Sequence, residues 1–331
     1  MEIINFNNTH LSAAADLALQ NYQEERAAVA ALPAVDSVPD LAQFADAGFG
    51  AAAFERGKMV GFLCFYTPWN HAFTTYAKGS FSPVHAHGTV PDGRTEIYRR
   101  MYQMAARKLV EAGATSHSIG IYAHDTQARN AFYTYGFGLR CMDAIRPMEP
   151  VSCHRCQGYL YAELEAARKT ELLPLKNRMI VHLAESPAFM AYPLSGETEL
   201  EETHRRRNAR YFYAQKDGNI VAYLEITDRG ENFACDDNAM KNICGAFCLP
   251  EHRGRGVFQN LLNTAIAALK AEGYSRLGVD FESFNPAAYG FWLKYFTAYT
   301  HGVVRRIDEK ILERNRPPAS GGEIGKTGAA R

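Results

Sequence analysis

Hydrophobic positions recur along this chain with two periods, one typical of helices and one typical of strands. After Gly256, apolar residues fall at the spacing of a single helix face, with polar residues opposite. These apolar positions are Val257, Phe258, Leu261, Leu262, Ala265, Ile266 and Leu269. The segment before them, "MKNICGAFCLP", is mostly apolar and is typical of a buried strand. Because proline cannot donate to a strand ladder, we expect this strand to end at Pro250.

The same succession of elements occurs twice. Residues 108–138 and 268–298 each contain the end of a helix, a short strand, a loop and a second helix with paired aromatic residues. A hairpin pattern lies upstream of each, with turns at Arg56-Gly57 and Asp217-Gly218. The offset is close to 160 residues, which is about one domain length. We therefore predict a duplicated α/β domain, since solenoid repeats are only about 20–50 residues long.

The duplication places the domain boundaries. We predict an N-terminal domain over residues 1–147 and a C-terminal domain over residues 158–312. Residues 148–157 form the linker, which is rich in Pro and Cys. Residues 313–331 are rich in Pro and Gly, a composition that predicts a disordered tail.

Composition narrows the class of protein. Hydrophobic residues make up 47% of the 331 positions, which suits a globular protein with full cores. Lys and Arg together equal Asp and Glu at 36 each, so the net charge argues against a nucleic-acid partner. No apolar run reaches the roughly 20 residues of a membrane helix, and the first residues lack the features of a signal peptide. With seven cysteines in no framework spacing, we expect reduced thiols, a cytoplasmic location and no membrane partner.

The turn "EHRGRGV" between the apolar strand and the helix is the strongest candidate for chemistry. The unpaired N–H groups of a helix N-terminus bind anions, and Gly254 and Gly256 would let a phosphate approach the backbone. Arg253 and Arg255 add positive charge that can pair with phosphate oxygens. A solvated turn with no ligand is the alternative interpretation. The linker motif Cys153-His154-Arg155-Cys156 has no second pair to complete a zinc site, so we expect no metal.

In this context the turn resembles the signature of the GNAT superfamily of acyl-CoA-dependent N-acetyltransferases. Arg253, Gly256 and Phe258 stand at its three key positions, although Phe258 departs from the usual Gly or Ala. The later family element, Asn then Ala three residues on then an aromatic, is matched by "NPAAYGFW", with Asn285 and Trp292 at its ends. The resemblance covers both halves and implies two tandem α/β (α+β) domains, each a mixed, mostly antiparallel twisted sheet flanked by helices.

The resemblance also implies the reaction, the transfer of an acetyl group from acetyl-CoA to a primary amine. The corresponding loop in the first half, residues 79–96, lacks Arg-Gly-x-Gly and carries His85 and His87 instead. We therefore expect one acetyl-CoA site, in the C-terminal domain, and a degenerate N-terminal copy. The residues expected to bind acetyl-CoA are Phe247, Cys248 and Leu249 at a strand bulge, Arg253, Gly254, Arg255, Gly256, Val257 and Phe258 in the loop, and Asn285 and Trp292.

Direct transfer needs a base for the ammonium and an acid for the leaving thiolate. Asp280 and Glu282 fall on one face of a predicted strand, and Glu282 is the first choice for the base. Trp292 takes the place of the family's usual Tyr, so Tyr289 or Tyr295 is the candidate acid. The alternatives are that the thiolate leaves unassisted or takes its proton from water.

A second function remains open at this point. The unusual Trp292 and Phe258 favour an acyl-CoA-binding sensor or interaction protein on a catalytically decayed scaffold. The amine acceptor cannot be read from the motifs, and we expect its site near residues 186–189 and 233–238. A monomer or a homodimer is expected.

Overall fold

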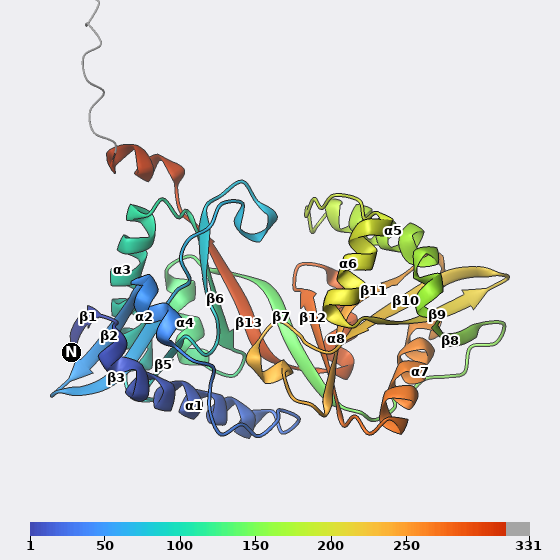
Figure 1. The fold of residues 1–331 in the computed structure, drawn as a ribbon, viewed down its shortest axis with the longest axis horizontal. Coiled ribbons are helices and arrows are strands. Elements are labelled where there is room, and N and C mark those ends of the chain that lie inside the picture. The colour runs from blue at the N-terminus through green and yellow to red at the C-terminus, as the bar shows by residue number, and fades with distance from the viewer. Residues whose placement is uncertain (316–331) are drawn as a thin grey trace, which may run out of the picture.

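The computed structural model describes residues 1–315 and shows the same order of elements in two successive halves (Figure 1). The first half contains β1 (Glu2–Asn5), α1 (Leu11–Ala28), α2 (Ala42–Ala47), β2 (Gly50–Glu55), β3 (Lys58–Cys64), β4 (Gly79–Ser82), β5 (His87–Thr89), α3 (Arg94–Glu111), β6 (Ser116–Tyr122), α4 (Thr126–Thr134) and β7 (Gly138–Pro147). The second contains β8 (Leu160–Leu164), α5 (Leu173–Ala184), α6 (Glu197–Arg207), β9 (Arg210–Lys216), β10 (Asn219–Thr227), β11 (Met240–Cys248), α7 (Val257–Ala271), β12 (Arg276–Glu282), α8 (Pro286–Tyr295) and β13 (Thr297–Arg306).

The predicted repeat is present element by element. The strands β6 and β12 are each seven residues long, and they start at Ser116 and Arg276, 160 positions apart. The hairpins β2–β3 and β9–β10 turn at the predicted glycines, Gly57 and Gly218, both of which have positive φ. Because both halves keep this order, each half forms a mixed α/β unit of the predicted kind.

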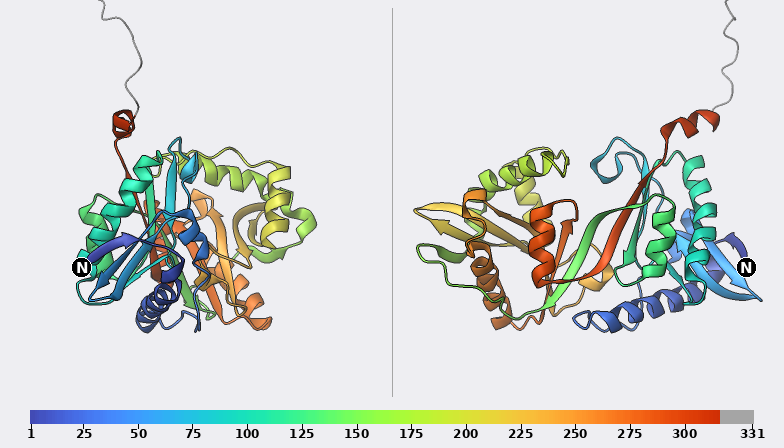
Figure 2. Two further views of the ribbon diagram at one scale, coloured as in Figure 1. Left: turned by 60° about the vertical axis from the view of Figure 1, so that its left-hand side comes forward. Right: turned by 180° about the vertical axis from the view of Figure 1, so that it is seen from behind.

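A single nine-stranded sheet joins the halves, in the order β4-β6-β13-β7-β12-β11-β10-β9-β8. The last strand of each half lies between the last two strands of the other half, so that β13 separates β6 from β7, and β7 separates β12 from β13. Figure 2 shows β7 and β13 side by side at the centre of the molecule. The remaining strands of the first half form a separate sheet, β1-β2-β3-β5.

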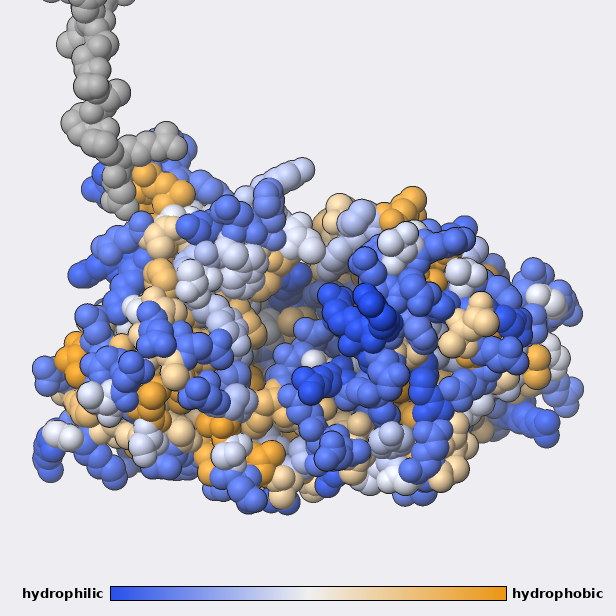
Figure 3. Space-filling model, in the orientation of Figure 1, coloured by the Kyte–Doolittle hydropathy of each residue, from blue (hydrophilic) through white to orange (hydrophobic). Residues whose placement is uncertain are grey.

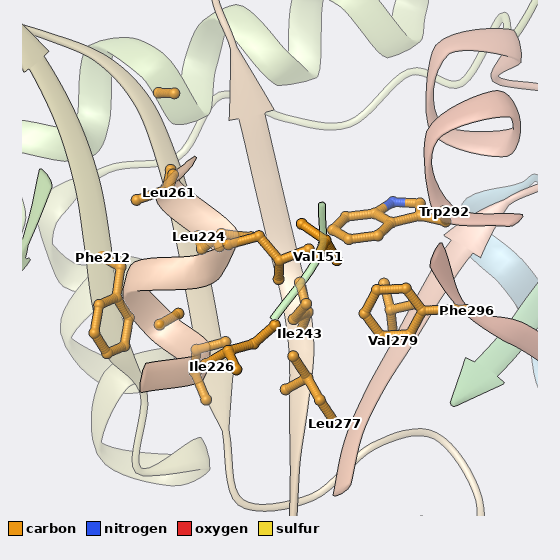
Figure 4. Packing of buried hydrophobic residues seen from close by; sticks show 14 of the residues in the cluster. Val151, Phe212, Leu224, Ile226, Ile243, Leu261, Leu277, Val279, Trp292 and Phe296 are labelled. Atoms are coloured by element: carbon orange, nitrogen blue, oxygen red, sulfur yellow. The ribbon is translucent and has the colours of Figure 1, made fainter. Parts of the chain in front are cut away.

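Helices cover each half of this sheet with their apolar faces. The predicted helix after Gly256 is α7, and the buried residues of its apolar face pack on β9, β10 and β12 (Figure 4). Helix α3 occupies the equivalent place in the first half and buries residues including Met101, Tyr102 and Leu109. None of the described helices is long and apolar enough to cross a membrane.

The segment predicted as a linker lies against α7. The backbone of Val151 exchanges two hydrogen bonds with the side-chain amide of Asn263, at 2.7 and 2.8 Å. The predicted tail begins too early, because residues 313–315 belong to the 3-10 helix Glu309–Asn315. The rest of the predicted tail, residues 316–331, lies outside the described residues. Division into two contiguous domains stays a prediction, and the central sheet crosses the proposed boundary.

Because β7 and β13 complete the sheet of the opposite half, neither half should fold alone. Expressed separately, residues 1–157 and 158–331 would each lose a central strand and expose an unpaired ladder next to β6 or β12. We expect each fragment to lack a cooperative thermal transition by circular dichroism. Co-expression of the two fragments should restore the transition, and a cooperative transition in either isolated fragment would contradict the exchange.

Candidate active site

The strands β11 and β12 separate partway along their length. They pair in parallel only from Met240 to Ile243, opposite Arg276 to Val279. The register of β11 against β10 then shifts, because Ile243 faces Ile226 and Gly245 faces Glu225, which leaves Cys244 as an extra residue. The bulge expected at Phe247 to Leu249 therefore lies earlier, at Cys244. Beyond it the edge of β11 that faces β12 is free to bind a ligand.

This gap opens into a cavity of about 1060 Å³ between the two halves. Figure 3 shows the surface hollowed between them. Strands from both halves contribute to the lining, as do the loops that follow β3, α5 and β10. Of the residues predicted from sequence, those that line the cavity are Phe247, Cys248, Arg253, Gly254, Val257, Phe258, Asp280, Glu282, Asn285, Trp292 and Tyr295.

Two left-handed glycines shape the turn into α7. Gly254 and Gly256 have φ of 71° and 85°, which glycine adopts without steric cost. Gly256 is the N-cap, and no side chain accepts a hydrogen bond from the first turn of α7. Its N–H groups therefore remain available to an anion. Arg253 stabilises the turn by donating to the Cys248 carbonyl at 2.8 Å, while Arg255 is exposed and lies outside the cavity lining.

Residues of the linker form hydrogen bonds with the turn and with the start of α7. The Cys156 thiol donates to the Arg255 carbonyl at 2.9 Å. The side chain of Asn260 donates to the carbonyls of Gly256 and His154, at 2.8 Å in each case. A Cβ placed on Gly256 would lie 3.2 Å from Cys156 Sγ, so the linker leaves little room for any other residue there. The turn is thus held in place before any ligand binds.

Aromatic residues fill the space between α7 and α8. Phe258 packs edge-on against Phe291 and Trp292, with ring centroids 5.0 and 5.9 Å apart. Trp292 is only 4% exposed and belongs to the core shown in Figure 4. Phe258 therefore has a packing role that explains its departure from the family pattern. Asn285 caps α8 by accepting from the Ala288 N–H at 3.4 Å.

The two predicted tyrosines differ in position. Tyr295 lines the cavity, and its hydroxyl accepts a hydrogen bond from Gln259 at 3.4 Å. Tyr289 is 41% exposed and contacts the ring of Phe281 instead. Leu249, which was expected at the bulge, also lies outside the cavity lining. Of the two tyrosines predicted from sequence, Tyr295 is therefore the one that lines the cavity.

Two carboxylates face each other across β7 and β12. Asp280 and Asp143 are directly opposite in the antiparallel register, an arrangement that is unfavourable when both are charged. Burial raises the pKa of Asp280 to about 8, with further increases from the charges of Glu231 and Asp143. Burial also raises the pKa of Asp143 to about 6, although hydrogen bonds from Thr300 and Asn232 oppose the increase. Asp280 is therefore suited to exchanging a proton near neutral pH.

Glu282 has a different partner. Its Oε2 lies 3.7 Å from Arg140 Nε, on the neighbouring strand β7. Burial raises the pKa of Glu282, whereas the charge of Arg140 lowers it. Glu282, the first choice for the base from sequence, therefore has an ion-pair partner, whereas Asp280 has none among the described residues.

Sequence reasoning missed the residues that the first half contributes. Asp143 and Arg140 reach the cavity because β7 is exchanged, and no motif marks them. The segments expected to bind the acceptor, residues 186–189 and 233–238, do not line this cavity, whereas the neighbouring residues 192, 193 and 195 and Glu231 and Asn232 do. Residues 233–235 instead form a 3-10 helix, in which Ala234 and Cys235 are buried.

The equivalent turn in the first half has different neighbours. Helix α3 also begins after a left-handed glycine, Gly93, but its first residue is Arg94. Arg94 is buried and forms ion pairs with Glu24 and Asp125, at 2.8 and 3.0 Å. His87 is also buried, and its ring bonds to the Tyr98 hydroxyl and a backbone carbonyl. The two carboxylates therefore bring negative charge beside the first residue of α3, which disfavours an anion there.

Other chemistry finds little support in the described residues. No group of three or more His, Cys, Asp or Glu side chains is placed to hold a metal ion in that part of the chain. All seven cysteines are free. Burial raises the pKa of Cys248 to about 11, which disfavours the thiolate that a covalent mechanism would need.

The raised pKa of Asp280 predicts a pH-dependent stability. Between the ordinary value of 3.8 and about 8, the folded state holds a proton that the unfolded state has lost, so stability falls as pH rises. We expect Asp280→Asn to raise the free energy of unfolding at pH 8 by about 1–3 kcal/mol, and much less at pH 4. Denaturant titrations at both pH values measure this. The exposed Asp36→Asn is the control, and an equal effect at both pH values would contradict the prediction.

Comparison with known proteins agrees with this geometry. Residues 177–296 match the model of the acetyltransferase (GNAT) family. A GCN5-related N-acetyltransferase from Sphaerobacter thermophilus superposes with a TM-score of 0.54 at 10% identity, over 92% of this chain and 95% of that chain. A glucosamine N-acetyltransferase region in a fungal multi-domain beta-N-acetylglucosaminidase gives 0.50 at 14% identity, over 92% and 38% of the two chains.

A tandem GNAT protein from the clavulanic acid biosynthesis pathway gives a TM-score of 0.46 at 15% identity, over 92% and 97% of the two chains. A search of curated proteins by sequence found no match. At these identities the similarity shows the fold alone, and it confirms the predicted fold class across the length of the chain. The chain is therefore a GNAT-fold protein whose residues 177–296 belong to the GNAT acetyltransferase family.

Proposed function

We propose that the protein is an N-acetyltransferase that moves the acetyl group of acetyl-CoA to a primary amine in its C-terminal half. One observation carries the proposal: the uncapped N-terminus of α7 and the Asp280 carboxyl open into one cavity, beside the free edge of β11. An anion site, a strand edge and a base of suitable pKa are what this transfer needs.

The residues at one end of the cavity would hold acetyl-CoA. The N–H groups of the first turn of α7 would bind the pyrophosphate, with Arg253 adding charge. Backbone groups of Gly245 to Phe247, which are past the bulge and unpaired on the β12 side, would bind the pantetheine arm. In the first half, the ion pairs of Arg94 support the proposal that this copy binds no acetyl-CoA.

The transfer then follows from the positions of Asp280 and Tyr295. The Asp280 carboxylate takes a proton from the acceptor ammonium, and the neutral amine attacks the thioester carbonyl to form the C–N bond. The tetrahedral oxyanion collapses with cleavage of the C–S bond. The Tyr295 hydroxyl donates its proton to the leaving thiolate, since Trp292 has no acidic hydroxyl to offer. The tyrosinate then takes the extra proton from the nitrogen of the new amide.

A sensor that binds acetyl-CoA without turnover is the second candidate, favoured by the burial of Trp292 where the family has its usual Tyr. Calorimetry with acetyl-CoA, followed by a thiol-release assay with a panel of amines, separates the two functions. Binding with turnover is the expected result. Binding without turnover on any amine would support the sensor, and absence of binding would exclude both.

The turn before α7 gives a specific test of acetyl-CoA binding. Gly256→Val places a branched side chain at φ 85° and against Cys156, so we expect a loss of at least tenfold in affinity for acetyl-CoA by calorimetry. Gly273→Val, at φ 96° past the other end of α7, imposes comparable backbone strain in open space and is the matched control. Equal affinity in the two variants would refute the placement.

The base gives a second test. Because the pKa of Asp280 is about 8, kcat/KM should rise with pH and level off above that value. Asp280→Asn should lower kcat by about 10²–10⁴-fold and remove this pH dependence, with the affinity for acetyl-CoA unchanged. Glu282→Gln, on the same strand face, should have a smaller effect and keep the pH dependence. The reverse order of effects would identify Glu282 as the base.

A further inference from the structure

The floor of the cavity runs across the exchanged strands. In register, Gly120 of β6 faces Gly302 of β13, Gly302 faces Cys141 of β7, and Cys141 faces Glu282 of β12. All four line the cavity. A Cβ on Gly302 would collide with Cys141 Sγ, so only glycine fits there. The floor is therefore smooth between the carboxylates of the second half and the far wall in the first half.

The two ends of this floor differ in chemistry. The acidic end carries Asp143, Asp280 and Glu282, with Glu231 on the neighbouring loop. The far end is lined mostly by apolar side chains of the first half: Trp69, Phe73, Phe81, Pro83 and Val84. Phe81 and Val84 pack over Gly120, within 3.6 Å of where its Cβ would lie. No acidic side chain of the described residues lines this far end.

One polar side chain of the first half lies at the apolar end. Ser118 of β6 lines the cavity and is only 5% exposed. Its hydroxyl could exchange one hydrogen bond with a ligand there without adding a charge.

The loop between β3 and β4 closes the apolar end. Trp69 pairs with Gly79 through two backbone hydrogen bonds, at 2.9 and 3.0 Å. Phe73 has a φ of 55°, which is strained for a bulky residue. Its ring lies 5.4 Å from the guanidinium of Arg140 and 5.3 Å from the ring of Trp69. The loop thus holds two aromatic rings over the cavity at a cost in backbone energy.

We propose that the acceptor is an amphiphilic primary amine, with its ammonium between Asp143 and Asp280 and its apolar chain directed along the floor toward Phe81 and Trp69. This rests on the proposed function and adds the substrate class. The first half, which has no acetyl-CoA site in this scheme, becomes the half that selects the acceptor. Strands β7 and β6 are two strand spacings apart, about 10 Å, so the chain would have room to extend.

The same features disfavour a diamine or polyamine of equal length. A second ammonium would have to lie beside Phe81 and Val84, where no carboxylate compensates its desolvation. Arg140, next to the floor, would repel it further. A terminal methyl group at the same place would instead lose water-exposed apolar surface, which is favourable.

Calorimetry on the full chain, with coenzyme A present, tests the proposal without requiring turnover. The probes are butylamine, octylamine and 1,8-diaminooctane. Octylamine should bind at least tenfold more tightly than butylamine, because each buried CH₂ adds about fourfold in affinity. It should also bind at least tenfold more tightly than the diamine. Equal or tighter binding of the diamine, no dependence on chain length, or no binding of any of the three amines overturns the proposal.

A pair of loop variants locates the chain. Trp69→Ala should weaken octylamine at least threefold and leave butylamine and coenzyme A unchanged, because only a long chain reaches Trp69. Tyr76→Ala is the matched control, since Tyr76 is on the same loop but 97% exposed. Equal effects of the two variants would contradict the placement. If the unaltered protein does not bind coenzyme A, the proposed function itself is wrong.

Discussion

The strands β7 and β13 pair with each other and lie between the last two strands of the opposite halves. Everything at the cavity depends on this exchange. It brings Asp143 and Arg140, which belong to the first half of the sequence, into register with Asp280 and Glu282 of the second half. It also makes the sheet continuous beneath the cavity, so that the floor has no gap at the boundary between the halves. A separate C-terminal domain would lack half of the site.

The facing carboxylates at the cavity lower the stability of the folded state. Two aspartates face each other in the register of β7 and β12 and have few compensating charges. Burial raises both pKa values, and the charge of Asp143 adds to the increase at Asp280. A purely structural sheet would avoid this cost by placing an apolar residue at either position. Such an unfavourable pair is typical of functional sites, where the protein gains a base that can exchange protons near neutral pH.

Duplication gave two copies of one fold, and the copies differ where α3 and α7 begin. In the second half, α7 starts with free N–H groups behind two left-handed glycines. In the first half, α3 also starts after a left-handed glycine, but its first residue, Arg94, is paired with two carboxylates. At the strand positions that align with Asp280 and Glu282, β6 carries Gly120 and Tyr122. The two copies therefore differ in residue type at the helix N-terminus and on the strand that follows.

The sequence alone determined what depends on neighbours along the chain. The period of the hydrophobic residues, the turn glycines and the 160-residue offset predicted the elements and their duplication. The Arg253 to Phe258 turn predicted an anion site. All of these features depend on local backbone chemistry. Only the tertiary structure decided which carboxylate is free, since Arg140 reaches Glu282 and not Asp280 through strand pairing. It also placed Trp292 in the core and brought Trp69, Ser118 and Asp143 into the cavity. The order of strands in the sheet depends on contacts between residues far apart in the sequence, and no local pattern predicts it.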